Sequence, residues 1–373
     1  MFVGITNAPR DYAWGSRTAI PEFLGTPPSG GPEAELWLGA HPGSPARLAD
    51  GSGDLRTVLD DRLPFLLKVL AAASPLSLQA HPTPAQAEEG FAREEASGVP
   101  IDAPNRSYKD PFHKPELLVA VSDTFDALCG FRPVAEILAS LARLPASAGL
   151  EDLRGRLTGD GSLPAVFKWL ITRGEGVEEL VAELPRRAAG VEGLEFETVR
   201  RLAAGFPGDP GIVISLLLNT VRLSRGEALY LPAGNIHAYL EGLGIELMAA
   251  SDNVLRGGLT AKHVDVPELL KVLDFTPRPI PYLEPEVTSS GVRIFRPDVP
   301  DFALAEVMVD GGGEARVPLP GPAIALCTGG AVHVSGGHAD RALVRSEACY
   351  ISPDEGELTI AGSGTVFVAT TNA

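Results

Sequence analysis

Four residues of the chain carry side chains that can bind a divalent metal ion. Gln79 and His81, in the segment SLQAHP, are two positions apart, so a strand there would place both on one face. Glu116, in HKPE, and His237, in AGNIHAY, add a carboxylate and a second imidazole. Two imidazole nitrogens with two side-chain oxygens form a mixed set that suits a divalent metal such as zinc. In the purely structural alternative, Gln79 caps a turn and His237 packs beneath a loop.

Charged residues are concentrated in the segment that follows His237, HAYLEGLGIELMAASDNVLRGGLTAK (237–262). Arg256 precedes two glycines, a turn in which a guanidinium group can hold a phosphate or stabilise an oxyanion. An ion pair of Arg256 with Asp252 or Glu246 is the alternative. Lys262 follows in the same segment.

Three lysines, Lys68, Lys109 and Lys114, lie in or beside apolar, strand-like segments. Lys68, in FLLKVL, is the most informative, because a lysine in an apolar strand is costly unless it is paired or faces a cavity. A nearby acidic partner for Lys68 is the alternative to a functional role.

Several common catalytic motifs are missing from the sequence. It contains no GxxxxGK[ST] phosphate loop, no HExxH and no GxSxG. These observations disfavour a P-loop kinase, a zincin protease and an α/β-hydrolase.

Composition and charge narrow the class of partner. The 373 residues include 31 Lys and Arg against 48 Asp and Glu, a formal charge of −17. This charge argues against a nucleic-acid partner, but a few local cations can still bind a small anionic substrate. We expect no membrane span, because Lys68 interrupts the best apolar run, and the N-terminus does not resemble a signal peptide. The three widely spaced cysteines favour a reducing compartment, so we expect a cytoplasmic protein.

The predicted secondary structure differs between successive segments of the chain. Short apolar segments between turns predict strands over residues 1–82 and 112–131, whereas Thr83 as a cap and Pro84 in the first turn predict a helix over 83–97. Apolar spacing of three and four predicts helices over 133–205. After GDPG (208–211) we expect strands, at IVISLLLN (212–219), EALYLPAG (227–234) and IELMAAS (245–251). The Pro-rich stretch 276–286 is the best linker candidate, and 287–373 is expected to be all β.

A short internal repeat suggests two related β-barrels. GEALYLPAG (226–234) resembles SEACYISPD (346–354), each with a turn before an apolar strand and a proline after it. His237 follows the first copy by three residues, and the second copy has no histidine at that distance.

Taken together, these motifs resemble the type I mannose-6-phosphate isomerases, zinc enzymes of the cupin superfamily. The resemblance covers residues 1–135 and 211–275. It is carried by DYAWGS (11–16), AELWLGAHP (34–42), PFLLKVLAAASPLSLQAHP (64–82), YKDPFHKPELL (108–118) and HAYLEGLGIELMAASDNVLRGGLTAKHVD (237–265). It implies that Gln79, His81, Glu116 and His237 hold one zinc ion and that Arg256 is the catalytic arginine.

The resemblance also implies the reaction, the interconversion of mannose 6-phosphate and fructose 6-phosphate by proton transfer through an enediol or enediolate. Further catalytic and substrate-pocket residues implied by the match are Trp14, Glu35, Lys68, Ser77, Lys114, Glu246, Asp252 and Lys262. For the general base, Glu246, Lys114, Lys262 and a zinc-bound hydroxide all stay open. Phe112 is a departure, because the family commonly has Asn before His-Lys-Pro-Glu.

The implied fold is mainly β with an inserted α-helical domain. We expect a catalytic cupin jelly-roll barrel from residues 1–132 and 211–285, a helical domain at 133–210, and a metal-free C-terminal jelly roll at 286–373. The expected partner is a small sugar phosphate, without nucleic acid or membrane, and the expected state is a monomer. The alternatives are an iron-dependent cupin and a non-catalytic sugar-phosphate-binding cupin.

Overall fold

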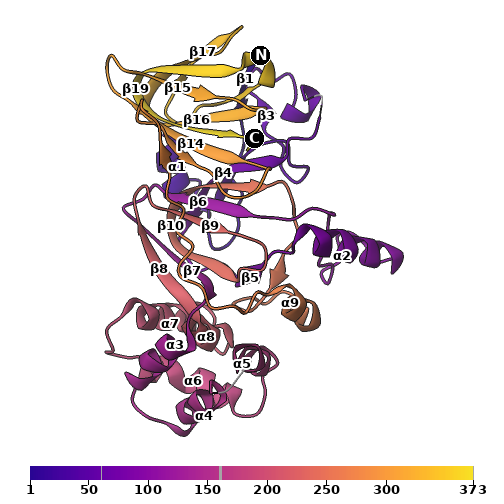
Figure 1. Ribbon diagram of the computed structural model, residues 1–373, viewed down its shortest axis with the longest axis vertical. Helices are drawn as coiled ribbons and strands as arrows, with labels where there is room; N and C mark the ends of the chain where they lie inside the picture. The colour runs from indigo at the N-terminus through magenta and orange to yellow at the C-terminus, as the bar shows by residue number, and fades with distance from the viewer. Residues whose placement is uncertain (60, 159–161, 373) are drawn as a thin grey trace.

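Two antiparallel sheets and a group of helices build the molecule (Figure 1). The computed structural model describes residues 1–59, 61–158 and 162–372. The nine-stranded sheet consists of β2 (Glu35–Leu38), β4 (Phe65–Ala72), β5 (Gln79–Ala80), β6 (Glu116–Ala120), β7 (Thr124–Phe131), β8 (Leu218–Ser224), β9 (Ala228–Leu231), β10 (His237–Ala249) and β11 (Leu255–Arg256). The ten-stranded sheet consists of β1 (Phe2–Thr6), β3 (Arg47–Leu48), β12 (Glu286–Val287), β13 (Arg293–Phe295), β14 (Ala303–Val309), β15 (Glu314–Pro318), β16 (Ala323–Ser335), β17 (Asp340–Val344), β18 (Ala348–Ile351) and β19 (Glu357–Thr370).

The two sheets share one pairing order. In the first, β2, β4, β10, β6 and β9 are hydrogen-bonded in sequence, and in the second β13, β14, β19, β16 and β18 follow the same order. The chain's first strand belongs to the second sheet, because β1 pairs with β18 and with β3. Residues 2–6 and 47–48 therefore lie in the sheet built by the C-terminal segment.

The internal repeat maps onto equivalent strands. Gly226 and Ser346 both have positive φ, +84° and +73°, and each precedes a four-residue strand, β9 or β18. The next strand begins at His237 in the first copy and at Glu357 in the second. Where His237 faces the interior, Glu357 forms an exposed ion pair with Arg316.

β4 is buried on both faces, which accounts for an apolar sequence that only Lys68 interrupts. Phe65, Leu67, Val69 and Ala71 pack in a cluster that includes residues of the ten-stranded sheet, so this face joins the two sheets. The opposite face carries Leu66, Lys68, Leu70 and Ala72 and points into the nine-stranded sheet's own core. Lys68 is thus placed among apolar side chains inside the fold.

Within the described residues, six α-helices lie between β7 and β8 at the end of the molecule away from both termini (Figure 1). They are α3 (Val134–Ala142), α4 (Ala148–Arg156), α5 (Ser162–Ile171), α6 (Val177–Arg187), α7 (Leu194–Gly205) and α8 (Gly211–Ile214). The prediction of a strand over 212–219 was wrong for its first part: α8 and a 3-10 turn, Ser215–Leu217, precede β8. A short run that is apolar on every side carries no periodicity, so burial among helices rather than the local pattern decided its form.

Outside this block, α1 (Ala19–Leu24), α2 (Pro84–Ala96) and α9 (Val266–Val272) complete the helices, with further 3-10 turns at Leu55–Thr57 and Pro353–Glu355. The helix predicted over 83–97 is confirmed, and Thr83 and Gln86 form a reciprocal capping box. The predicted linker contains no helix or strand over residues 276–285, and its last residue, Glu286, begins β12. It is held against β9, since Tyr230 N donates to Pro281 O at 3.0 Å. Among the helices of the described residues, none combines the length and apolar character needed to traverse a lipid bilayer.

Candidate metal centre and substrate site

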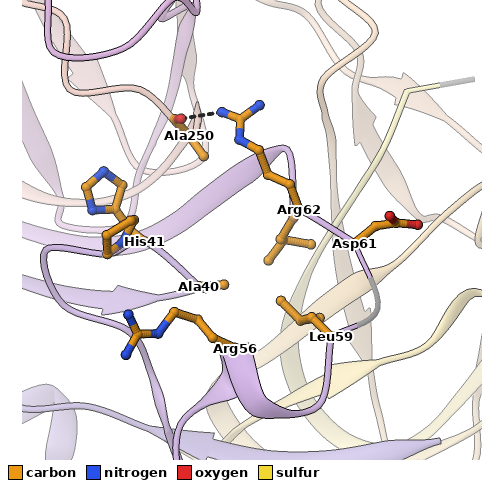
Figure 2. Close-up of a pocket in the computed structure, with 9 residues that line it drawn as sticks. Ala40, His41, Arg56, Leu59, Asp61, Arg62 and Ala250 are labelled. Carbon is orange, nitrogen blue, oxygen red and sulfur yellow. Dashed lines mark hydrogen bonds between the residues drawn. The ribbon is translucent and has the colours of Figure 1, made fainter.

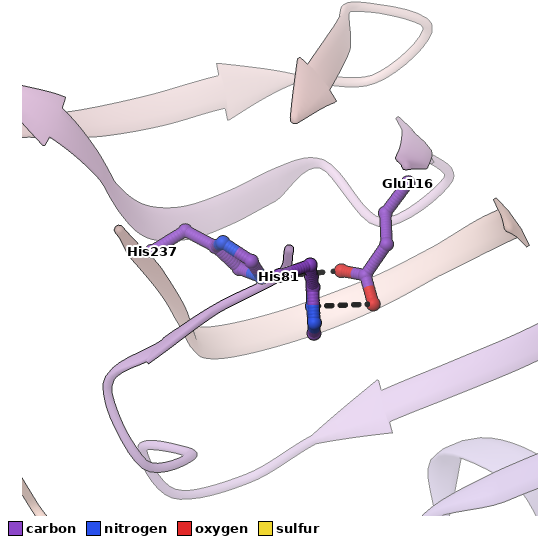
Figure 3. Close-up of side chains that lie close together, drawn as sticks. All are labelled: His81, Glu116 and His237. Carbon is purple, nitrogen blue, oxygen red and sulfur yellow. Dashed lines mark ion pairs between the residues drawn. The ribbon is translucent and has the colours of Figure 1, made fainter. Parts of the chain in front are cut away.

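Three buried side chains converge inside the nine-stranded sheet (Figure 3). His81 Nε2 lies 3.2 Å from Glu116 Oε1, and His237 Nε2 lies 3.2 Å from Glu116 Oε2. The potential ligand atoms of all three residues lie within 4.8 Å of one another. Each residue is only 1% exposed, so the cluster is shielded from bulk water.

The sheet itself brings the three together. Glu116 begins β6 and His237 begins β10, while His81 directly follows β5. Gln79 and His237 are direct cross-strand partners, and Glu116 opposes Met248 farther along β10. Gln79 Nε2 lies 3.4 Å from His237 Nε2, so the amide of the fourth predicted ligand reaches the same cluster.

Hydrogen bonds at the outer ring nitrogens determine the form of both histidines. His81 Nδ1 lies 2.7 Å from the carbonyl oxygen of Asn253, and His237 Nδ1 lies 2.9 Å from that of Asn235. A carbonyl oxygen can only accept, so each Nδ1 carries a proton and each ring turns its Nε2 toward Glu116. Carbonyl partners of this kind commonly orient histidines that bind metals.

Electrostatics at the cluster favour a cation. Burial, followed by the charge of Lys114, lowers the pKa of His81 to about 4, so its ring is neutral near pH 7. Burial would raise the pKa of Glu116, but Lys114 and His81 outweigh it and lower the pKa well below its usual value. Among the described residues, His81 Nε2 and Glu116 Oε2 have no hydrogen-bond partner although both are buried. Two imidazole nitrogens facing a carboxylate fit a divalent metal, and zinc is well suited to this donor set.

A second layer of charge lies beside the cluster on the same interior face. Lys68 Nζ is 2.8 Å from Glu246 Oε2 and 3.6 Å from Glu35 Oε1, and Glu35 Oε2 accepts from Trp37 Nε1 at 2.7 Å. Burial opposes the charge of Lys68, but Glu246 and Glu35 outweigh burial and raise its pKa. Burial raises the pKa of Glu246 despite Lys68, and Glu116 and Glu35 add to the rise. The acidic partner considered as the alternative to a functional role for Lys68 is thus present. This ion pair lies beside the metal-ligand cluster.

Lys114 connects this layer with the metal ligands. Its Nζ is 3.1 Å from Glu116 Oε1, and the side chain is 10% exposed. The ammonium therefore sits at the edge of the cluster, within ion-pair distance of Glu116.

Arg256 and Lys262, the two predicted cations that follow His237 in the chain, lie close to each other and to Lys109. The pKa of Lys262 is lowered by burial first and then by the positive charges of Arg256 and Lys109. Burial also lowers the pKa of Arg256. Within residues 1–59, 61–158 and 162–372, no acidic side chain forms an ion pair with Lys109, Arg256 or Lys262. The predicted alternative, an ion pair of Arg256 with Asp252 or Glu246, does not form. Arg256 pairs with Gln79 across β11 and β5, which puts these cations beside the metal ligands.

Asp252 has a different partner. Its Oδ1 lies 3.4 Å from His41 Nε2, and Gly43 N donates to His41 Nδ1 at 3.1 Å, so Nε2 carries the ring proton. His41 also borders a cavity of about 340 Å³ (Figure 2). The other lining residues are Ala40, Pro42, Arg56, Leu59, Asp61, Arg62, Leu63 and Ala250. The cavity does not include the three metal-binding candidates among its lining residues.

The two remaining predicted pocket residues are half-buried. Trp14 stacks on Tyr12 at a centroid distance of 5.7 Å and packs against the core of the nine-stranded sheet. Ser77 lies two residues before Gln79. No polar partner is recorded for the Ser77 hydroxyl in the part of the chain that the structure describes.

Two further residues lie near the site, and one of them was missed by sequence reasoning. Asn253, in the charged segment 237–262, is fully buried; its side chain accepts from Lys109 N at 2.7 Å and donates to Phe112 O at 2.8 Å, which fixes the loop before Lys114. Tyr239, the residue that was missed, is buried, and its ring lies 6.1 Å from that of His237. The two-residue spacing of His237 and Tyr239 on a strand was the available signal for Tyr239.

The chain is similar in sequence and in fold to known proteins of one family. A family model described as phosphomannose isomerase type I, catalytic domain, matches residues 2–134. A mannose-6-phosphate isomerase of Escherichia coli K12 is 37% identical over 96% of this chain and 97% of its own length. The human mannose-6-phosphate isomerase is 32% identical over 82% of this chain and 81% of its own. A crystal structure of mannose 6-phosphate isomerase from Salmonella typhimurium, bound to fructose 6-phosphate and zinc, matches over all of both chains, with a TM-score of 0.91 and 34% identity.

The resemblance seen in the sequence motifs is confirmed by identity over nearly the whole chain and by the shared fold. The chain belongs to the mannose-6-phosphate isomerase family.

Proposed function

We propose that this protein interconverts mannose 6-phosphate and fructose 6-phosphate, with a zinc ion held by Gln79, His81, Glu116 and His237. One observation carries the proposal. A buried group of two imidazoles and a carboxylate lies next to cations that have no acidic partner within the described residues. The first part suits a metal, and the second suits a phosphate. The iron-dependent alternative leaves the cations unexplained, and identity over nearly the whole chain to a mannose-6-phosphate isomerase favours catalysis over binding alone.

The reaction moves one proton from C2 of the aldose to C1 of the ketose and one proton from O2 to O1. No electrons are gained or lost overall. Because the C2 proton is only weakly acidic, negative charge must be stabilised on the two oxygens as it develops. Zinc, when bound, supplies a positive charge that polarises or orients those oxygens.

The cations next to the ligands divide the remaining work. Arg256, adjacent to Gln79 in the sheet, provides a guanidinium for the charge that develops on the enediolate. Lys262, with Lys109 beside it, binds the phosphate, and the Ser77 hydroxyl donates to the same group. Trp14, Glu35 and Lys68 line the sugar's side of the pocket.

Proton transfer falls to groups on the interior face. Lys114 is within reach of both Glu116 and the pocket, and its ammonium can donate to an oxygen of the substrate. Glu246 is buried and its raised pKa brings it nearer to the range in which a carboxylate works as a base at neutral pH. Asp252 orients His41, whose ring lies near the positive charges of Lys68 and Lys114. The pH dependence of kcat in variants of Lys114 and of Glu246 would show which of the two acts as the base.

The proposed organisation follows the pairing order of the two sheets. We infer a cupin jelly-roll barrel from residues 1–132 and 211–285, a helical insertion at 133–210, and a second jelly roll at 286–373. β1 and β3, from the N-terminal segment, belong to the sheet of the second jelly roll. The repeated strand order supports a common origin of both barrels. We further propose that the enzyme is a monomer of the cytoplasm, where its three buried, unpaired cysteines stay reduced.

The decisive experiment is an isomerase assay with mannose 6-phosphate on three samples of the same protein: as purified, after chelation, and after zinc is restored. We expect activity to be lost on chelation and to return with zinc, at a content of one ion per chain. Restoration by ferrous iron with oxygen uptake would identify the iron-dependent alternative instead. Full activity in metal-free protein would refute the role of zinc.

A further inference from the structure

We infer that Asp209 is a positioning residue for the substrate site, because its carboxylate holds the loop 257–262 that presents Arg256 and Lys262. This inference rests on the proposed function and deepens it. Asp209 lies in the GDPG turn between α7 and α8, and nothing in its local sequence connects it with Arg256 or Lys262.

The contact is made by hydrogen bonds to the backbone of the loop. Asp209 Oδ1 accepts from Leu259 N at 2.9 Å and from Gly211 N at 2.7 Å. Asp209 Oδ2 lies 3.4 Å from Thr260 N, a longer contact. One carboxylate thus ties two consecutive amides of the loop to the start of α8.

The loop needs an external restraint because of its backbone conformation. Gly258 has φ of +123° and Leu259 has φ of +54°. A leucine in this left-handed region is strained, and such a residue persists only where its surroundings determine its conformation. Leu259 is 1% exposed and packs in the cluster of the helical block, so the helices hold its side chain while Asp209 holds its amide.

The opposite side of the loop is attached to the metal-ligand strand. Gly257 N donates to Leu78 O at 2.7 Å, and Leu78 N donates to Gly258 O at 3.0 Å. β5 therefore fixes the Arg256 end, and Asp209 is the restraint nearest to the Lys262 end. Beyond it, Thr260 Oγ1 accepts from Lys262 N at 3.0 Å, which continues the chain of contacts to Lys262.

The two segments fit closely. A side-chain carbon added at Gly211 would lie 2.7 Å from Leu259 Cδ2 and 2.8 Å from Asp209 Oδ1. Even a methyl group at position 211 must therefore displace the loop or the carboxylate. This gives a second way to disturb the same contact without removing Asp209.

Asp209 works as a hydrogen-bond acceptor, since no ion pair of its carboxylate is recorded within the described ranges. Asn can keep the Oδ1 acceptor and its bonds to Leu259 and Gly211, whereas Ala keeps none. The pair Asp209→Ala and Asp209→Asn therefore separates the loss of the contact from the loss of the charge. Ser147→Ala is the matched control, because Ser147 Oγ also accepts from a backbone amide in the helical block, that of Leu150.

The test measures binding of inorganic phosphate to the zinc-loaded protein, together with kcat and KM for mannose 6-phosphate. We expect Asp209→Ala to weaken phosphate binding and lower kcat/KM by about tenfold or more, with zinc content unchanged. Asp209→Asn should stay within about threefold of the parent, and Gly211→Ala should follow Asp209→Ala. Ser147→Ala should lower only thermal stability.

A double variant makes the test specific. If Asp209 acts through Lys262, adding Asp209→Ala to Lys262→Ala should weaken phosphate binding by less than about twofold further. An undiminished effect in that background, or phosphate binding unchanged in both Asp209→Ala and Gly211→Ala, overturns the inference. If Asp209→Ala does not fold, Gly211→Ala and Asp209→Asn still decide it. Failure of the parent protein to isomerise mannose 6-phosphate would refute the proposed function, whereas the phosphate measurement tests Asp209 separately.

Discussion

The ammonium of Lys68 and the carboxylate of Glu246 meet at 2.8 Å across β4 and β10, although the residues are 178 positions apart in the chain. They are direct partners in the sheet register, and their side chains are 7% and 3% exposed. Charges this deeply buried are tolerated only when they are paired, so each residue requires the other.

Lys68→Met should therefore lower the free energy of unfolding by about 3–5 kcal/mol, because it leaves Glu246 and Glu35 buried without their cation. Adding Glu246→Gln should recover part of this loss. Urea unfolding of the zinc-loaded protein measures both. The control is Arg316→Met, which breaks an exposed pair with Glu357 and should cost no more than about 1 kcal/mol. A Lys68→Met protein as stable as the control would contradict the prediction.

Glu116→Gln should reduce the zinc content well below one ion per chain. Glu116 is the one carboxylate among the four proposed ligands, and its negative charge balances the charge of the metal. Metal analysis after dialysis, and the rise in melting temperature on zinc addition, should both show the loss. Full zinc occupancy in this variant would exclude Glu116 as a ligand.

Arg256→Ala should lower kcat by about 10²–10³-fold, as for the loss of a group that stabilises charge in the transition state. Zinc content and circular dichroism should not change. Arg56→Ala is the control, since Arg56 is exposed and paired with Asp54. If Arg256→Ala raised only KM, Arg256 would bind substrate without stabilising the transition state.

Lys262→Ala should raise KM for mannose 6-phosphate by about tenfold with a smaller change in kcat, because a phosphate contact made in both the ground and transition states acts mainly on binding. Inorganic phosphate should inhibit this variant less strongly than the parent. Lys168→Ala, on an exposed position of α5, serves as the control. Equal phosphate inhibition in the variant and the parent would argue against a role in phosphate binding.

The stability of the protein should fall in acid partly through His41. Burial lowers the pKa of His41 below its ordinary 6.5, and Asp252 opposes this only in part. Below pH 6.5 the His41 ring binds a proton in the unfolded chain but not yet in the folded chain. The free energy of unfolding therefore falls with decreasing pH until the folded ring is also protonated. His41→Asn should show a shallower loss of melting temperature from pH 6.5 downward. Parallel profiles of variant and parent would show that His41 does not contribute.

Residues close in the chain were predictable where one local pattern was enough. Thr83, Pro84 and Gln86 predict the start of α2, because capping depends on hydrogen bonds within one turn. The segment IVISLLLN was mistaken for a strand over its first residues, because a uniformly apolar run lacks the period that separates strand from helix. The pairing of β1 with β18 has no signal in either segment, since strand partners more than 300 positions apart are selected by the packing of the whole sheet.

The amino-acid sequence by itself determined which side chains are available: two imidazoles, a carboxylate, an amide and a set of lysines and arginines, in an order that pointed to one family. Tertiary structure alone decided their states. It turned two imidazole Nε2 atoms toward Glu116 through carbonyls of Asn235 and Asn253, and it paired Lys68 while giving Arg256 no acidic partner among the described residues. It also brought Asp209 against Leu259. The physical reason is that protonation, pairing and desolvation depend on distances between atoms far apart in the chain, and those distances exist only once the sheets have packed.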